Sequence, residues 1–117
     1  GELKTFPRGQ PIIREGEIGD EMYVLIKGTA DVFINSSIQR RMVRTLRRGD
    51  VFGEMGLIRH NERTADVVAN EDVEVIAVNE RFLDRMQRRY PRIGAKIFLN
   101  IAKILSDRLQ ESQRAKA

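Results

Sequence analysis

Residues 52–67 read FGEMGLIRHNERTADV, and the fold and the function of the chain are inferred from this stretch outward. Gly53 and Glu54 stand at a turn, and the apolar run 55–58 that follows is long enough for one helical turn. A polar loop comes next, and Arg63 stands behind it at the start of a strand-like run. A carboxylate, a helix start and a guanidinium at this spacing suit a small ligand that carries both a phosphate and a sugar hydroxyl.

The geometry of a short helix explains this combination. The first N–H groups of a helix have no partner within it and carry partial positive charge, so they attract anions. A helix over residues 55–58 would point these groups back toward Gly53 and Glu54. The guanidinium of Arg63 can bind two phosphate oxygens at once, and the hydroxyl of Thr64 lies next to it. Glu54 would repel an anion, but it can accept a hydrogen bond from a neutral hydroxyl of the same ligand.

The same residues also have a purely structural interpretation. Glu54 could be a surface carboxylate, and Arg63 could be the ion-pair partner of Glu62 or Asp66. Spacing alone does not decide between the two interpretations. In the ligand interpretation Asp66 has no explanation, because a carboxylate that faced the site would repel a phosphate.

The composition indicates one small domain and excludes several kinds of catalytic site, and we expect no enzymatic activity. The chain has 117 residues, no cysteine and a single histidine, His60, within the polar loop. Thiolate chemistry is therefore excluded, and a metal or catalytic site built on histidines is not expected. No apolar run approaches the roughly 18 residues of a membrane span, and no signal peptide is visible. We expect a cytoplasmic protein, or the cytoplasmic part of a membrane protein.

Basic residues exceed acidic ones and gather in two places. The chain has 21 Lys and Arg against 17 Asp and Glu, a net charge of +4, with arginine clusters at residues 40–48 and 85–92. A basic surface attracts anions in general, including nucleic acids. Acidic residues are interleaved along the rest of the chain, however, and the two clusters hold a single aromatic side chain, Tyr90, which is too few for a row of stacking platforms. Contact with DNA is therefore an alternative and not the main expectation.

Residues 1–79 have the pattern of a β jelly roll, also called a double-stranded β-helix. Short runs of β-forming residues are separated by Gly, Asp and Asn, which is typical of such folds. The strands are expected at residues 12–13, 22–27, 30–34, 41–46, 64–69 and 73–78. Gly28 and Thr29, between the second and third of these runs, predict a tight hairpin.

Residues 80–113 have the pattern of two helices. Asn79 is a suitable N-cap, and Pro91 ends the first helix. The second helix is expected over residues 92–113, and both helices have one apolar face. The face of the last helix needs a partner surface, which makes it a candidate for homo-oligomer contacts. We expect residues 1–117 to form a single domain.

The quoted stretch resembles the phosphate-binding cassette of the cyclic nucleotide-binding domain family. The family pattern is roughly F-G-E, a small residue, an aliphatic pair, a variable loop, and R-[S/T/A]-A-x-V. Residues 14–34, REGEIGDEMYVLIKGTADVFI, are similar to the family's strand, glycine loop and hairpin ahead of the cassette. Residues 46–54, LRRGDVFGE, are similar to its approach strand, and the two terminal helices also match, so the resemblance covers nearly the whole chain.

The resemblance implies a role for each site residue. Glu54 would accept a hydrogen bond from the ribose 2′-hydroxyl, and Arg63 would neutralise the cyclic phosphate. The other ligand-binding candidates are Gly53, Met55, Gly56, Thr64 and Ala65, whose backbone N–H groups would add donors; Val32, Val43 and Leu46, which match positions that wall the base; Phe52; and Arg108 of the last helix, which forms a lid in many members.

The function implied by the resemblance is that of a regulatory sensor. It would bind cyclic AMP or cyclic GMP, with no other cofactor, and relay a conformational change to an effector beyond the chain ends. We expect cyclic AMP because it is the commoner ligand in the family, although Thr64 could hydrogen-bond a guanine amino group. Two alternatives stay open, namely an interaction module of the same fold without a ligand, and a nucleic-acid-contacting fragment of a transcription regulator.

Overall fold

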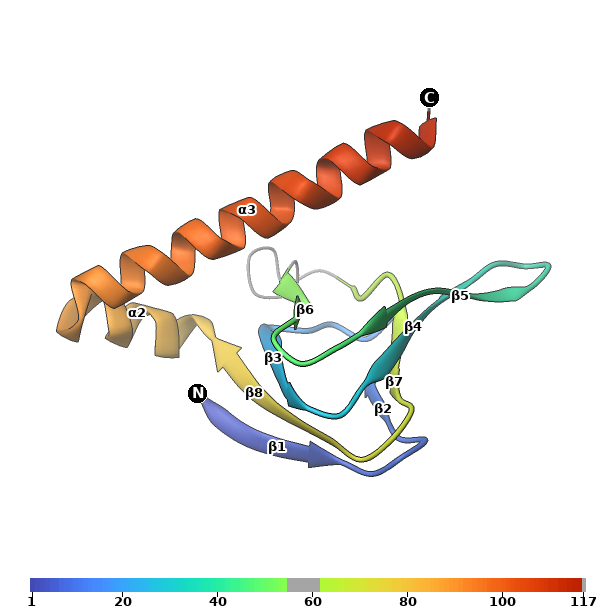
Figure 1. Cartoon of the computed structure of the whole chain (residues 1–117), viewed down its shortest axis with the longest axis horizontal. Helices are drawn as coiled ribbons and strands as arrows, with labels where there is room; N and C mark the ends of the chain where they lie inside the picture. The colour runs from blue at the N-terminus through green and yellow to red at the C-terminus, as the bar shows by residue number, and fades with distance from the viewer. Residues whose placement is uncertain (55–61, 117) are drawn as a thin grey trace. The chain divides into compact units, whose positions relative to one another are not determined.

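The computed structural model describes residues 1–54 and 62–116 of the chain (Figure 1). The chain divides into two compact units, Gly1–Glu80 and Arg81–Ala117. The short helix expected over residues 55–58 lies outside the described residues, and so do the candidate ligand residues Met55 and Gly56.

The described part of the first unit is built from two antiparallel sheets. Its strands are β1 (Glu2–Phe6), β2 (Pro11–Ile13), β3 (Glu21–Lys27), β4 (Ala30–Asn35), β5 (Arg40–Leu46), β6 (Val51–Phe52), β7 (Asp66–Ala69) and β8 (Val73–Asn79). One sheet has the order β1-β8-β3-β6 and the other the order β2-β7-β4-β5 (Figure 1). Consecutive strands alternate between the sheets in the manner of a jelly roll, except for the β4–β5 hairpin within one sheet, so the predicted fold class is confirmed.

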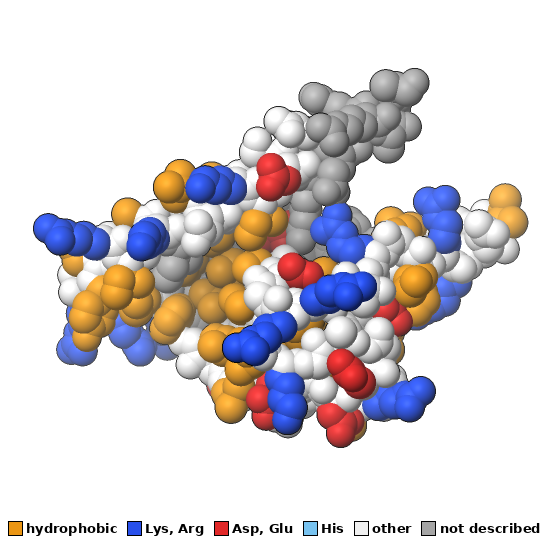
Figure 2. Space-filling model, viewed as in Figure 1, with side chains coloured by type: hydrophobic (Ala, Val, Ile, Leu, Met, Phe, Trp, Pro, Cys, Tyr) orange, Lys and Arg blue, Asp and Glu red, His pale blue; other side chains and the backbone are white. Residues whose placement is uncertain are grey.

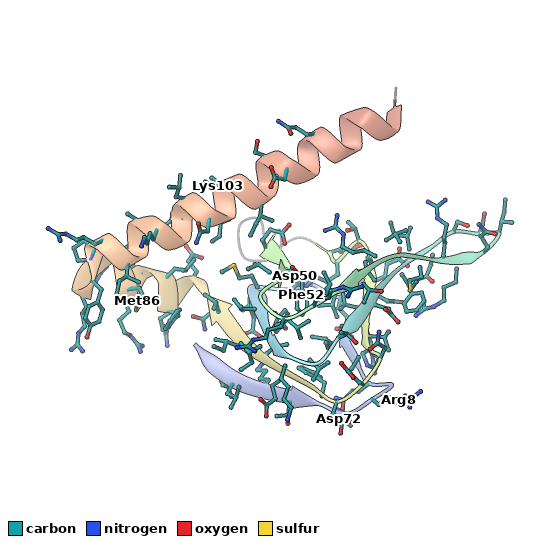
Figure 3. The ribbon with its side chains drawn as sticks, in the orientation of Figure 1. Arg8, Asp50, Phe52, Asp72, Met86 and Lys103 are labelled. Carbon is teal, nitrogen blue, oxygen red and sulfur yellow. The ribbon has the colours of Figure 1, made fainter. Side chains whose placement is uncertain are left out.

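The core lies between the inner faces of the two sheets. Strand β8 shows the alternation of a half-buried strand, with Val73, Val75 and Ala77 almost fully buried. Phe52 points into the interior (Figure 3) and stacks on Tyr23 from the neighbouring strand, with 5.3 Å between the ring centroids. This contact anchors β6, and with it the start of the stretch 52–67, to the core of the roll.

The tight hairpin predicted at Gly28 and Thr29 is wrong. Strands β3 and β4 belong to different sheets, so the chain passes from one sheet to the other at these two residues. Gly28 has φ +86°, and a Cβ atom there would lie 2.3 Å from the backbone oxygen of Asp72. Thr29 accepts a hydrogen bond from the N–H of Asn70 at 3.1 Å, which holds the crossing in place. A glycine between two β runs does not by itself show which strands pair.

The change from strands to helices falls at the predicted place. Strand β8 ends at Asn79, α2 covers Glu80–Arg89, and α3 covers Pro91–Lys116. Pro91 is the first residue of α3, where the missing N–H costs no helical hydrogen bond. The last helix extends slightly beyond the predicted residue 113.

The two helices approach each other closely at Gly94. A Cβ atom at this position would lie 2.9 Å from the Cα atom of Gln87 in α2. Helix α3 carries exposed apolar side chains, among them Ile93, Phe98 and Leu99, and a homo-oligomer contact through this helix stays a prediction. Over the described residues, we find no helix with the length and apolar character required to span a membrane.

Candidate functional site

Two charged side chains are buried in the described part of the chain, and both belong to the stretch 52–67. Glu54 is 1% exposed and Arg63 is 9% exposed. Burying a charged group is costly unless polar partners replace the lost water. The interpretation of Glu54 as a surface carboxylate is therefore wrong. The buried guanidinium of Arg63 should have polar partners around it.

Backbone carbonyl groups hold the guanidinium of Arg63. Its Nη1 donates to the oxygen of Gly53 at 2.8 Å, and its Nη2 donates to the oxygen of Glu21 at 2.7 Å. The cation also lies over the ring of Tyr23, with Cζ 6.0 Å from the centroid. A guanidinium has five N–H donors. These two carbonyl groups accept from only some of the donors, and they fix the direction in which the other N–H groups point.

The backbone of Arg63 is held as firmly as its side chain. Its N–H donates to the oxygen of Glu17 at 2.8 Å, and its own oxygen accepts from the N–H of Gly16 at 2.9 Å. Ile18 and Glu62 form an antiparallel bridge just beside these bonds. The loop between β2 and β3 thus pairs with the chain around Arg63, although the two segments are far apart in sequence.

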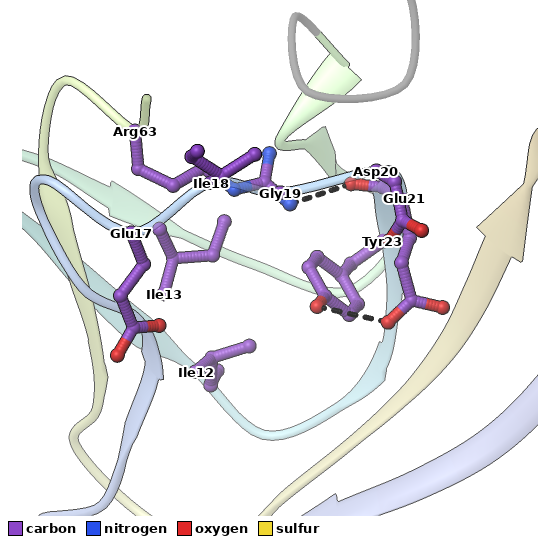
Figure 4. A pocket seen from close by; sticks show the side chains of 9 residues that line it. All are labelled: Ile12, Ile13, Glu17, Ile18, Gly19, Asp20, Glu21, Tyr23 and Arg63. Atoms are coloured by element: carbon purple, nitrogen blue, oxygen red, sulfur yellow. Dashed lines mark hydrogen bonds between the residues drawn. The ribbon is translucent and has the colours of Figure 1, made fainter. Parts of the chain in front are cut away.

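A pocket of about 140 Å³ lies beside Arg63 (Figure 4). It is lined by Ile12, Ile13, Glu17, Ile18, Gly19, Asp20, Glu21, Tyr23 and Arg63. Sites for small ligands usually measure roughly 300–1,000 Å³, so this pocket is too small for a whole nucleotide. Of the predicted ligand residues that the structure describes, only Arg63 lines it.

The other predicted site residues occupy several environments. Thr64 is exposed and Ala65 half-buried, both just before β7. Leu46 and Phe52 belong to the core, and Val32 packs against it. Val43 is 44% exposed, at the β4–β5 bulge where no residue stands opposite it. Arg108 lies in α3, in the second unit. The roles expected of these residues stay predictions.

Asp66 has a structural role that the sequence did not reveal. Its Oδ1 accepts from the N–H of Glu15 at 2.7 Å, and its Oδ2 accepts from Nδ2 of Asn35 at 3.0 Å and from Nη1 of Arg40 at 2.5 Å. The carboxylate therefore ties β7 to the β2–β3 loop and to the β4–β5 hairpin. Its ion pair is with Arg40, and the suggested pairing with Arg63 is not seen.

Asp66 should make the stability of the domain depend on pH. The N–H of Glu15, then the amide of Asn35 and the guanidinium of Arg40, hold the pKa of the Asp66 carboxyl below its ordinary value of 3.8. Because the folded pKa lies below the unfolded one, this stabilisation is present above the unfolded pKa and is lost as the pH falls through the folded one. Asp66→Asn should lower the free energy of unfolding at pH 7 by about 1–3 kcal/mol.

The measurement is urea unfolding at pH 7 and pH 3. The destabilisation caused by Asp66→Asn should shrink at pH 3, because this pH lies below the ordinary pKa of 3.8 and the carboxyl of the unfolded wild-type chain is mostly protonated there. Asp84→Asn is the matched control, because Asp84 pairs with Arg88 on an exposed helix surface and should cost little at either pH. An Asp66→Asn effect of the same size at both pH values would contradict the prediction.

The arginines of residues 40–48 lie on β5 and in the turn that follows it, and they are exposed. On the face of the molecule that Figure 2 shows, Lys and Arg side chains lie at several separate places, with Asp and Glu side chains between them. Arg40 is already engaged by Asp66. The charge is mixed on the face shown, and direct contact with nucleic acid stays an alternative.

Comparison with known proteins identifies the family. The family profile described as the cyclic nucleotide-binding domain matches residues 3–90, and the chain belongs to this family. It is 33% identical to the "Cyclic AMP receptor protein" of Thermus thermophilus over 112 residues, which are 95% of this chain and 50% of that protein. It is 35% identical to a "cGMP-dependent protein kinase" of Toxoplasma gondii over 111 residues, 95% of this chain and 10% of that protein.

A solved structure shows the same fold. The crystal structure of the Thermus thermophilus catabolite activator protein matches with a TM-score of 0.84 and 33% identity, over 96% of this chain and 51% of that one. The chain thus spans about half the length of one curated relative and a tenth of the other. In the longer relatives the matching region is one part of a larger protein.

Proposed function

We propose that this domain is a non-enzymatic sensor that binds a cyclic nucleotide, with cyclic AMP as the expected ligand, and relays binding to an attached effector. One observation carries the proposal. The two buried charged side chains of the described residues, Glu54 and Arg63, are those that the cassette motif assigns to the ligand. A cyclic ribose phosphate carries an anionic phosphate and a neutral hydroxyl close together, which matches one cation and one hydrogen-bond acceptor.

In the bound state Arg63 contacts the phosphate and Glu54 accepts from the 2′-hydroxyl of the ribose. The carbonyl groups of Gly53 and Glu21 already hold the guanidinium, so little side-chain entropy is lost on binding. The names of the relatives include both a cyclic AMP receptor and a kinase dependent on cyclic GMP. The exposed hydroxyl of Thr64 is the feature of this chain that favours cyclic GMP.

The relay proceeds through the helices by a shift between two populated conformations. Strand β8 passes into α2 without any intervening residue, since one ends at Asn79 and the other begins at Glu80. A displacement of the roll on binding therefore acts directly on the first turn of α2. The effector is a further domain or protein, in line with the greater length of the relatives.

Parallel calorimetric titrations with cyclic AMP and cyclic GMP test the proposal, with uncyclised 5′-AMP as the control. We expect saturable one-site binding, tighter for cyclic AMP, and NMR shifts of the amides of α2 and α3 at saturation. Absence of binding to both cyclic nucleotides would overturn the sensor function and favour the interaction module. Unmoved helix amides at saturation would overturn the relay. Salt-dependent binding of duplex DNA without nucleotide binding would favour the transcription-regulator alternative.

Glu54→Gln should reduce discrimination for the ribose hydroxyl. A hydrogen bond to a charged group contributes about 1.5–3 kcal/mol, so the affinity for cyclic AMP should fall roughly 10- to 150-fold. The affinity for 2′-deoxy cyclic AMP should change much less, because that ligand lacks the hydroxyl. Glu62→Gln, at an exposed glutamate of the same stretch, is the matched control. Equal losses for both ligands would remove Glu54 from this role.

A further inference from the structure

The loop between β2 and β3, residues 14–20, follows Arg63 from its backbone to the end of its side chain. Gly16 and Glu17 bond to the backbone of Arg63 at 2.9 and 2.8 Å. At the other end of the loop, the oxygen of Glu21 accepts from Nη2 at 2.7 Å. The backbone of the arginine is thus bonded to the start of the loop and its guanidinium to the first residue of β3, so the loop between them must pass alongside the side chain.

Gly19 is the residue at which this passage is tightest. A Cβ atom there would lie 2.1 Å from Nε of Arg63, 2.2 Å from Cζ and 2.3 Å from Nη2, far inside the 3.5–4.0 Å of ordinary contact. Figure 4 shows Gly19 directly beside the guanidinium. Any other residue at position 19 requires either the loop or the guanidinium to move.

The backbone conformation does not explain the glycine. Gly9, Gly16, Gly28, Gly49 and Gly53 have positive φ, and Gly19 does not. Position 19 therefore does not need a glycine on account of a positive φ. The need for a glycine at this position therefore comes from the neighbouring guanidinium.

The guanidinium is the part that yields more easily. The three atoms in conflict are at the end of a long, flexible side chain, whereas the loop is held by backbone bonds to Arg63. A methyl group at position 19 should therefore push the guanidinium off the carbonyl oxygen of Glu21 and leave the loop in place. The fold survives this change, but the orientation of the cation is lost.

We propose that Gly19 is a positioning residue for ligand binding, because the absence of a side chain at this position lets the loop hold the Arg63 guanidinium in the orientation that receives a phosphate. The proposal rests on the proposed function for its ligand. Bidentate binding of a phosphate depends on the direction of the N–H groups as well as on the charge. Gly19 acts through Arg63 and makes no contact with the ligand itself.

The test compares Gly19→Ala with Gly9→Ala, which lies outside the loop. Gly9 has φ +88° and nothing within 4 Å of an added Cβ atom, so its replacement adds strain without touching Arg63. Gly19→Ala should weaken cyclic AMP binding roughly 10- to 150-fold, the effect of one lost charge-assisted hydrogen bond. Gly9→Ala should leave the affinity within about twofold of wild type, as expected for a site with no contact to Arg63. Wild-type affinity in Gly19→Ala would overturn the proposal.

A double-mutant cycle separates positioning from a general structural role. In the Arg63→Ala background, Gly19→Ala should have no further effect on affinity, since no guanidinium remains to be displaced. If Gly19→Ala alone unfolds the domain, Arg63→Ala should restore the fold, because it removes the atoms in conflict. A defect of undiminished size in the Arg63→Ala background would overturn the proposal.

An NMR measurement without nucleotide separates the failure of this inference from the failure of the proposed function. The Nε–Hε signal of Arg63 should shift in Gly19→Ala and stay unchanged in Gly9→Ala. If wild type binds no cyclic nucleotide, the sensor function fails, while a selective shift still supports the displacement of Arg63. An unmoved signal in Gly19→Ala would overturn the inference whatever the ligand.

Discussion

Arg63→Ala is expected to weaken the binding of cyclic AMP by about 2–5 kcal/mol, which is roughly 30- to 5,000-fold in the dissociation constant. The phosphate would lose its charge-assisted hydrogen bonds at a site where Arg63 is 9% exposed and water replaces little of the loss. The carbonyl oxygens of Gly53 and Glu21 would also lose their donors. Calorimetric titration of both proteins measures the change.

Two further variants show whether the effect of Arg63→Ala comes from this particular guanidinium. Arg63→Lys keeps the charge without the planar fork, so it should recover only part of the affinity if orientation matters. Arg41→Ala removes an exposed arginine of β5 and should leave binding within about twofold. Urea unfolding of Arg63→Ala checks that it remains folded. A folded Arg63→Ala variant with wild-type affinity would exclude Arg63 from the phosphate site.

The sequence predicted what depends on local pattern. Runs of β-forming residues bounded by Gly, Asp and Asn located six of the eight strands in the described part of the chain, missing β1 and β6, and the change of period located the start of α2 at Glu80. The motif also selected Glu54 and Arg63, which are the charged side chains that the described structure buries. Both predictions have the same basis, because each needs only residues that lie close together in the sequence.

Contacts between distant segments could not be predicted in this way. Asp66 receives hydrogen bonds from Arg40, 26 residues earlier, and from Glu15, 51 residues earlier. The pairing of β7 with β4 sets Asp66 opposite Phe33, close to the end of the β4–β5 hairpin. Without that register, the sequence offered Arg63 as the nearest cation. The closeness of Gly19 to Arg63 was hidden for the same reason.

The crossing at Gly28 shows where a local pattern gives a wrong answer. A hairpin and a crossing between sheets both need two β runs joined by a short turn with a glycine. The difference is the choice of neighbours, since β3 lies between β8 and β6 while β4 lies between β7 and β5. Burial of Leu25 at 0% and Ala30 at 0% then requires the chain to bend sharply around the core between these two residues.

Gly28→Ala should therefore be among the most destabilising single substitutions in the domain. The new Cβ atom would lie 2.3 Å from the backbone oxygen of Asp72 and 3.1 Å from Cγ2 of Val73. Asp72 has little freedom to retreat, because its carboxylate accepts from the N–H of Arg8 at 2.9 Å, and the two residues lie side by side in Figure 3. Strain at positive φ and overpacking together should cost about 2–5 kcal/mol.

Comparison with Gly49→Ala isolates the steric part of this cost. Gly49 has φ +92°, close to the +86° of Gly28, but nothing lies within 4 Å of an added Cβ atom. The Gly49→Ala variant should be destabilised only by conformational strain at positive φ, by about 1–2 kcal/mol. Urea unfolding of the two variants should therefore differ, with Gly28→Ala clearly the less stable. Equal losses would mean that the turn around Asp72 relaxes freely, and the crossing would then owe its position to the strand neighbours and not to this contact.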